Sequence, residues 1–160
     1  MFHTQEKRSE VLISPIVCVN PEAWLGDAFY FWYSEHDAYH WGNVAKRKTG
    51  YFEVYQAEID CEDVLDTVFN EAHYTFWLKN IEKAKIKFAK AGINEVSLSI
   101  LNNYFKERNI WTQFRGIMFQ DISTKRSGIK DFHYIKRIQL GVFDVNIIAN
   151  FELKLEYKCV

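Results

Sequence analysis

Three short segments within the first sixty residues contain the side chains whose types and spacing could support chemistry on a bound ligand. The first is Phe-His-Thr at positions 2–4, the second is the aromatic run 26–32, and the third is the alternating segment 50–60, which ends in an acid. The imidazole of His3 can donate or accept a hydrogen bond, and the ring of Tyr30 can stack on a flat ligand. We treat these segments as one candidate binding site.

In this order, the three segments resemble the ADP-ribosyltransferase superfamily, in its small bacterial toxin-like branches. In that family a strand with His-Gly or His-Thr precedes Gly-x-Gly-Phe-Tyr, a helix with an alanine and an aromatic residue, and a strand that ends in Asp. The matching features here are the His-Thr pair, Gly26-Asp27-Ala28-Phe29-Tyr30, a helix with Ala38 and Trp41, and segment 50–60. The resemblance covers residues 1–66.

The resemblance implies that the ligand is NAD, used as a substrate. His3 would hydrogen-bond the adenosine ribose, main-chain groups near Thr4 would hold the nicotinamide amide, and Tyr30 would stack on the nicotinamide ring. Cleavage of the bond between nicotinamide and ribose passes through a transition state that resembles an oxocarbenium ion, as at other glycosidic centres. The site must therefore fix the leaving group and place an acceptor against the ribose carbon.

The same family places a carboxylate, usually Glu, on a late strand to hold a ribose hydroxyl and to favour positive charge on the sugar. In this chain Gln139 occupies the corresponding position, within segment 136–144. A glutamine can hydrogen-bond the sugar but carries no charge and cannot act as a general base. Gln139 and Tyr30 are the implied catalytic candidates, and Glu152 and Glu156 are the alternative carboxylates.

Each assignment has a plainer alternative when the residues are considered alone. His3 can be a solvated residue near the start of the chain, and Tyr30 can be a core tyrosine. Glu152 and Glu156 can lie on the solvated face of a strand.

Other polar clusters indicate less. His36 and His40 are four residues apart on one predicted helix face, but no third ligand is near in sequence, so we expect no metal site. By the resemblance, Arg115 or Arg126 would contact the target. Five lysines on a long predicted helix indicate a solvated face that could also contact a nucleic-acid backbone or an acidic partner: Lys79, Lys83, Lys85, Lys87 and Lys90.

The elements that must position these residues follow from hydrophobic periodicity and turn signals. Strands are predicted at 28–33, 51–59, 116–122, 135–142 and 151–157. Helices are predicted from Ser34, as N-cap, to about residue 48, and at 69–91 and 96–106. Segment 10–19 is predicted as a short helix or strand broken at Pro15, and residues 64–65 as a short helix capped by Asp60 or Asp63. The fold class is α+β with a mixed or mostly antiparallel sheet. The resemblance implies that this sheet is split, with the NAD pocket in the cleft.

Composition favours one cytoplasmic domain that spans residues 1–160. Hydrophobic residues make up 48% and aromatic residues 17%, which predicts an ordered core built on large rings. The formal net charge of −1 gives no global attraction for nucleic acid. Three scattered cysteines favour reduced thiols. We expect no membrane span and no secretory signal, because no uninterrupted apolar stretch is long enough.

The leading functional hypothesis is a bacterial, toxin-like mono-ADP-ribosyltransferase that moves ADP-ribose from NAD to a protein or nucleic-acid acceptor. Toxins of this kind commonly act beside a neutralising antitoxin protein. One alternative keeps the fold but lacks catalysis, since Gln139 replaces a glutamate. A second alternative is an unrelated α+β interaction module.

Overall fold

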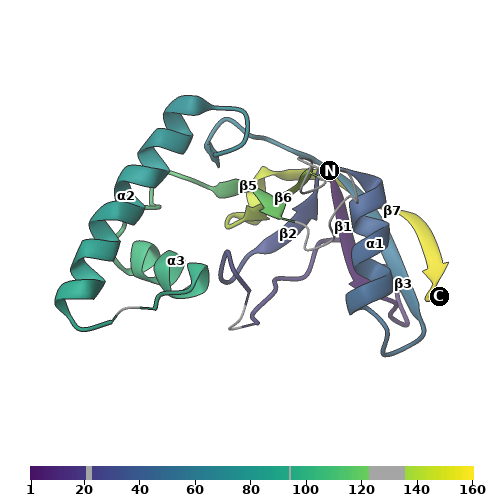
Figure 1. Cartoon of the computed structure of the whole chain (residues 1–160). Coiled ribbons are helices and arrows are strands. Elements are labelled where there is room, and N and C mark those ends of the chain that lie inside the picture. The colour runs from purple at the N-terminus through teal and green to yellow at the C-terminus, as the bar shows by residue number, and fades with distance from the viewer. Residues whose placement is uncertain (21–22, 94, 123–135) are drawn as a thin grey trace, which may run out of the picture.

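The computed structural model describes residues 1–20, 23–93, 95–122 and 136–160. Within these ranges the chain forms a seven-stranded sheet in the order β4-β5-β6-β2-β1-β3-β7 (Figure 1). Its strands are β1 (Phe2–Glu6), β2 (Phe29–Trp32), β3 (Tyr51–Ile59), β4 (Val64–Asp66), β5 (Gly116–Ile122), β6 (Lys136–Val142) and β7 (Ile148–Lys158). The helices are α1 (Glu35–Ala45), α2 (Glu71–Lys90) and α3 (Leu98–Glu107), with a 3₁₀ turn η1 (Val145–Ile147). Neighbouring strands are antiparallel except β4 and β5, which confirms an α+β fold with a mixed sheet.

The sheet is joined weakly at its middle. Strands β1 and β2 pair through one residue pair, Phe2 opposite Trp32. By contrast, β1 pairs with β3 along its whole length, and β2 pairs with β6 along its whole length. The two strands meet near Phe2 and diverge beyond it (Figure 1). From His3 onward, one edge of β1 pairs with β3. No strand of the described chain pairs with its other edge.

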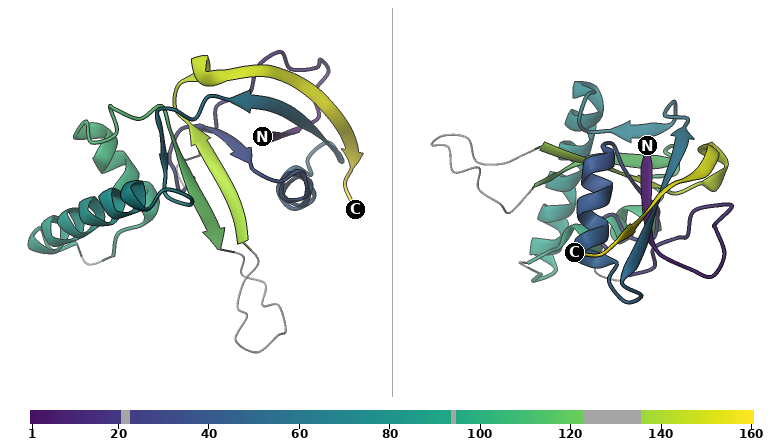
Figure 2. Two further views of the ribbon diagram at one scale, coloured as in Figure 1. Left: turned by 90° about the horizontal axis from the view of Figure 1, so that it is seen from above. Right: turned by 90° about the vertical axis from the view of Figure 1, so that its right-hand side faces the viewer.

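Apolar side chains cover both faces of the β4–β5–β6–β2 part of the sheet. Successive residues of a strand point to opposite faces, and in β5 Ile117 belongs to one hydrophobic cluster while Met118 belongs to another. Helices α2 and α3 cover the Ile117 face, where Ala84, Leu101 and Phe105 are buried. Figure 2 shows these two helices beyond one end of the sheet, while β3 and β7 curve together at the other.

Helix α1 packs on β1 and β3 through very small side chains. Ser34 is its N-cap, as predicted, and its buried residues are Ala38 and Gly42. A Cβ at position 42 would lie 2.2 Å from ring atoms of Phe52, so the close approach requires glycine there. Ala38, Trp41 and Ala45 share one side of the helix by their spacing, but only Ala38 is buried and the other two side chains are exposed.

Two other predicted elements differ from the structure. Residues 64–65 do not form a helix; they belong to β4, whose buried valine and leucine pair in parallel with β5. Segment 10–19 is neither a helix nor a strand, apart from one isolated bridge between Cys18 and Ala28. The strand predictions 51–59 and 116–122 are confirmed to the residue, and Gly92 follows α2 at a φ of 78°, as expected for a helix stop.

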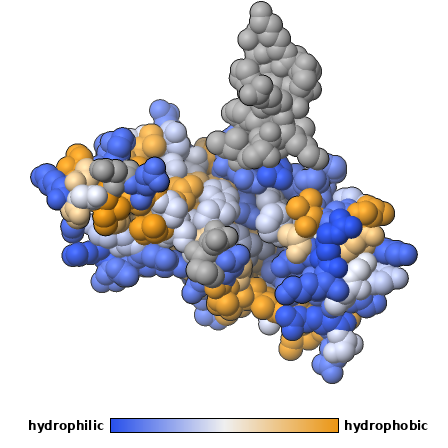
Figure 3. All heavy atoms as spheres, turned by 60° about the horizontal axis from the view of Figure 1, so that its bottom comes forward, coloured by the Kyte–Doolittle hydropathy of each residue, from blue (hydrophilic) through white to orange (hydrophobic). Residues whose placement is uncertain are grey.

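The surface is largely polar, with separate apolar patches that include the side of α2 and α3 (Figure 3). Leu78 and Ile86 of α2 and Ile100 of α3 are among the exposed apolar residues. Among the described residues, no helix combines the length and the apolar character that a bilayer span would need.

Candidate functional site

A cavity of about 550 Å³ lies where β1 and β2 diverge, and this volume is in the range of small-molecule sites. Its walls come from β1, residues 16–20 and 23–24, β2, α1, β5 and β6. The four residues predicted from the sequence, His3, Thr4, Tyr30 and Gln139, all line this one cavity. The divergence of the strands thus brings together side chains that are far apart in the sequence.

Large rings form much of the apolar wall. Trp24, Trp32 and Trp41 line the cavity together with Tyr30. The ring of Trp24 lies 5.3 Å from that of Phe119 on β5, and Trp32 lies 5.9 Å from Trp41. These rings offer flat faces to a planar ligand.

The hydroxyl of Tyr30 is occupied by the turn that precedes β2. It donates to the carbonyl oxygen of Gly26 at 2.8 Å and accepts from the backbone N–H of Leu25 at 3.1 Å. Burial raises the pKa of Tyr30 well above its usual value, so the phenol stays protonated. Tyr30 can therefore offer a ligand its ring, while its hydroxyl fixes the turn.

Gln139 is 5% exposed and its amide is held by Trp24. The indole Nε1–H of Trp24 donates to the Oε1 atom of Gln139 at 2.9 Å. An indole is only a donor, so its partner must be the amide oxygen and not the amide nitrogen. Reversing the amide would place two donors together, and an unpaired buried donor costs about 1–3 kcal/mol.

His3 is buried, and its tautomer follows from its neighbours. The Nδ1 atom lies 2.8 Å from the carbonyl oxygen of Tyr30, so Nδ1 carries the proton and donates it. The Nε2 atom is then an acceptor, and it is buried with no hydrogen-bond partner in the described part of the chain. Burial lowers the pKa of His3 to about 4, so the ring is neutral near pH 7.

The depressed pKa of His3 predicts a loss of stability in mild acid. The unfolded chain takes up a proton near pH 6.5, whereas the folded chain resists it until about pH 4. The free energy of unfolding should therefore fall as the pH drops from 6.5 to 4, by up to about 3 kcal/mol from this group. Urea unfolding at a series of pH values measures this, with His3→Leu as the control that lacks the titrating ring. An imidazolium signal from His3 in folded protein at pH 6 would contradict the prediction.

Thr4 contributes its main chain to the cavity. Its hydroxyl donates to the carbonyl oxygen of Ala38 in α1 at 2.8 Å, which ties β1 to the helix. The open edge of β1 beside the cavity provides main-chain donors and acceptors. The resemblance implies that main-chain groups near Thr4 hold the nicotinamide amide, and this stays a prediction.

Charged groups occupy the β5–β6 side of the cavity. Arg137 forms an ion pair with Asp121, and its guanidinium lies 5.7 Å from the centre of the Trp32 ring. Burial raises the pKa of Asp121, and Arg137 opposes that rise. Lys46, at the end of α1, is a second cation on the wall. The described part of the cavity wall thus carries two cations and one carboxylate, which is already paired.

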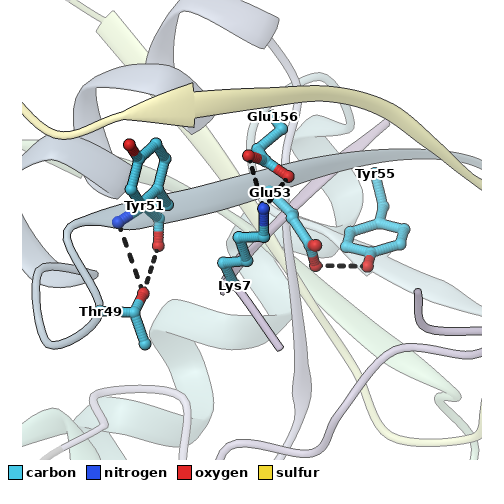
Figure 4. Close-up of polar contacts among 6 residues, drawn as sticks. All are labelled: Lys7, Thr49, Tyr51, Glu53, Tyr55 and Glu156. Atoms are coloured by element: carbon cyan, nitrogen blue, oxygen red, sulfur yellow. Dashed lines mark hydrogen bonds and ion pairs between the residues drawn. The ribbon is translucent and has the colours of Figure 1, made fainter. Parts of the chain in front are cut away.

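Several other predicted residues lie outside the cavity wall. Glu152 and Glu156 are exposed on β7, and Glu156 forms an ion pair with Lys7 at 2.7 Å (Figure 4). Arg115 is held by Asp144 through two contacts, at 2.9 and 3.0 Å. Arg126 lies outside the described residues.

The remaining polar clusters behave as surface features. No set of three or more His, Cys, Asp or Glu side chains within the described ranges is arranged to hold a metal ion, so His36 and His40 gain no third ligand there. The five lysines of α2 are exposed.

Sequence reasoning missed Trp24, Arg137 and Asp121. Trp24 lies in a turn-rich segment. A large aromatic ring with a hydrogen-bond donor in such a segment was the available signal of a specific role. Arg137 and Asp121 are charged residues on strands that also carry apolar side chains. They lie opposite each other where β6 pairs with β5, and only the structure reveals this.

The fold and the cavity define an α+β protein whose mixed sheet opens at its middle into a ring-lined pocket. No family model matches this chain, and neither a curated protein nor a solved structure matches it.

Proposed function

We propose that the cavity binds NAD and that the protein transfers ADP-ribose from NAD to a macromolecular acceptor. One observation carries this proposal: residues assigned to NAD from separate motifs, His3, Thr4, Tyr30 and Gln139, line a single cavity. The cavity lies where β1 and β2 separate, which is where a split sheet would place the dinucleotide.

Each wall of the cavity matches a part of the dinucleotide. Ring faces suit the nicotinamide, and Nε2 of His3 can accept from a ribose hydroxyl. The edge of β1 can pair with the carboxamide. Lys46 and Arg137 supply positive charge for the diphosphate.

The reaction breaks the bond between the nicotinamide nitrogen and the ribose carbon, and nicotinamide leaves with the electron pair. An acceptor oxygen or nitrogen then forms a bond to that carbon and loses its proton to solvent or to a base on the acceptor. Asp121 is the carboxylate on the described cavity wall, and Arg137 pairs with it. With no unpaired carboxylate on the described part of the wall, Gln139 stabilises the cationic sugar weakly, so we expect slow turnover.

The described part of the cavity wall carries no unpaired carboxylate, which favours a second candidate, a module that binds NAD without cleaving it. The two candidates share NAD binding and differ in turnover. A neutralising partner protein is compatible with either one.

Calorimetric titration with NAD tests binding. Tyr30→Leu removes the stacking ring and should cost on the order of 1 kcal/mol, or about fivefold in Kd. Tyr30→Phe keeps the ring, so it isolates the effect of releasing the turn at Leu25 and Gly26. Tyr51→Leu, at an exposed tyrosine on β3 outside the cavity wall, is the matched control and should not change Kd.

Turnover is tested by incubating purified protein with labelled NAD and whole-cell lysate, followed by protease or nuclease in parallel samples. Label that one digestion releases identifies the acceptor class. NAD binding without any labelling or nicotinamide release favours the module that only binds. Folded wild-type protein that does not bind NAD would overturn both.

A further inference from the structure

We propose that Trp24 is a positioning residue that fixes the amide of Gln139, so that this position offers a ligand an N–H donor. The single contact that carries the inference is the 2.9 Å hydrogen bond from Trp24 Nε1 to Gln139 Oε1. Because the indole can only donate, the Nε2 amide is the polar group that Gln139 has left for the cavity.

The turn that carries Trp24 is itself fixed from several sides. The Nδ2 atom of Asn102, buried in α3, donates to the carbonyl oxygen of Trp24 at 2.8 Å. The Tyr30 hydroxyl binds the next two residues of the turn, and Lys106 Nζ donates to the carbonyl oxygen of Asp27 at 2.9 Å. The indole also packs on the ring of Phe119. Trp24 is therefore set in place before a ligand arrives.

A fixed donor at position 139 selects for an acceptor on the ligand. If the ligand is NAD, which rests on the function proposed above, that acceptor is an oxygen of the ribose. A donor directed at this oxygen holds the ribose in place but brings no negative charge to its cationic form, so it stabilises the transition state less than a carboxylate would. The polarity set by Trp24 thus makes cleavage slower than with a glutamate at position 139.

The same geometry predicts what a carboxylate would do at this position. In Gln139→Glu, one oxygen would accept from Trp24 and the other would face the cavity as an acceptor. A hydrogen bond to the charged form lowers a carboxyl pKa. The Trp24→Phe change keeps a ring but removes this donor, so the pKa of the introduced carboxyl should rise.

The experiment compares Gln139→Glu with Trp24→Phe/Gln139→Glu in protein without ligand. The carboxyl carbon signal of residue 139 is followed by NMR as the pH is changed. We expect its pKa to be about one pH unit higher in the double variant. Trp77→Phe/Gln139→Glu is the matched control, because Trp77 Nε1 is buried, lacks a partner in the described chain, and lies outside the wall of this cavity. That control should leave the pKa unchanged.

A second measurement uses NAD binding in a double-mutant cycle of Trp24→Phe and Gln139→Ala. Trp24→Phe should weaken binding several-fold in the wild-type background and have little effect once Gln139 is alanine. Equal carboxyl pKa values with and without Trp24 would overturn the positioning role. A pKa difference in protein that fails to bind NAD would support the positioning role and refute the proposed function.

Discussion

Replacing Gln139 with alanine is expected to reduce nicotinamide release from NAD by about 100-fold or more. Gln139 lines the cavity and is the described residue on β6 that corresponds to the expected ribose contact. Removing one preorganised hydrogen-bonding group from a reacting centre has typically this effect. Release of nicotinamide from labelled NAD measures it directly.

A fold check and three further variants show whether an effect on activity comes from Gln139 itself. Gln139→Ala also leaves Trp24 Nε1 without its acceptor, so its fold must be checked by thermal unfolding. Gln139→Glu keeps an acceptor for Trp24 and adds a charge that stabilises a cationic sugar, so turnover should be equal or higher. Loss of activity in Glu152→Ala or Glu156→Ala alone would move the catalytic role to β7.

Gly42→Ala is expected to destabilise the folded protein, because it disturbs the packing of α1 on β3. The added methyl group would lie 2.2 Å from the ring of Phe52, which is fully buried under α1. Overpacking of this kind costs about 1–3 kcal/mol or more, and the better helix propensity of alanine recovers only about 1 kcal/mol. We expect a net loss of about 2 kcal/mol, which lowers Tm by roughly 4–8 °C in a chain of this size.

The clash can be tested by shortening its partner. Phe52→Leu alone should destabilise the protein, since it leaves a gap beneath the helix. Combined with Gly42→Ala, the two effects should be clearly less than additive, because the methyl group would occupy part of that gap. Additive losses of stability would show that α1 and β3 do not approach as closely as described.

Long apolar elements, and the short β2 that follows a turn signal, could be predicted from the sequence, whereas the three-residue β4 could not. Strand β3 is nine residues long and rich in apolar side chains, and α2 places Ile81, Ala84 and Phe88, at helical spacing, in one hydrophobic cluster. By contrast, β4 has three residues, too few for a period to be visible. Its parallel pairing with β5 depends on a segment about fifty residues further along the chain.

Part of the candidate site was predictable for a different reason. His3 and Tyr30 lie in motifs of the first sixty residues whose order can be read from the sequence, and Gln139 was assigned only as the residue in place of the family's late-strand carboxylate. Trp24 and Arg137 take their roles from partners on other elements, Gln139 and Asp121. Such pairings form only when the sheet is assembled, so no local sequence pattern predicts them.

The way the cavity is assembled also sets when it can exist during synthesis. Its walls need both β1 and β6, and almost every other element lies between these strands in the sequence. A nascent chain that ends before residue 136 has the ring of Tyr30 but neither Gln139 nor the strand that pairs with β2. Contacts of such high sequence separation form late and slowly. If the cavity binds NAD as proposed, a chain truncated before residue 136 should therefore bind none.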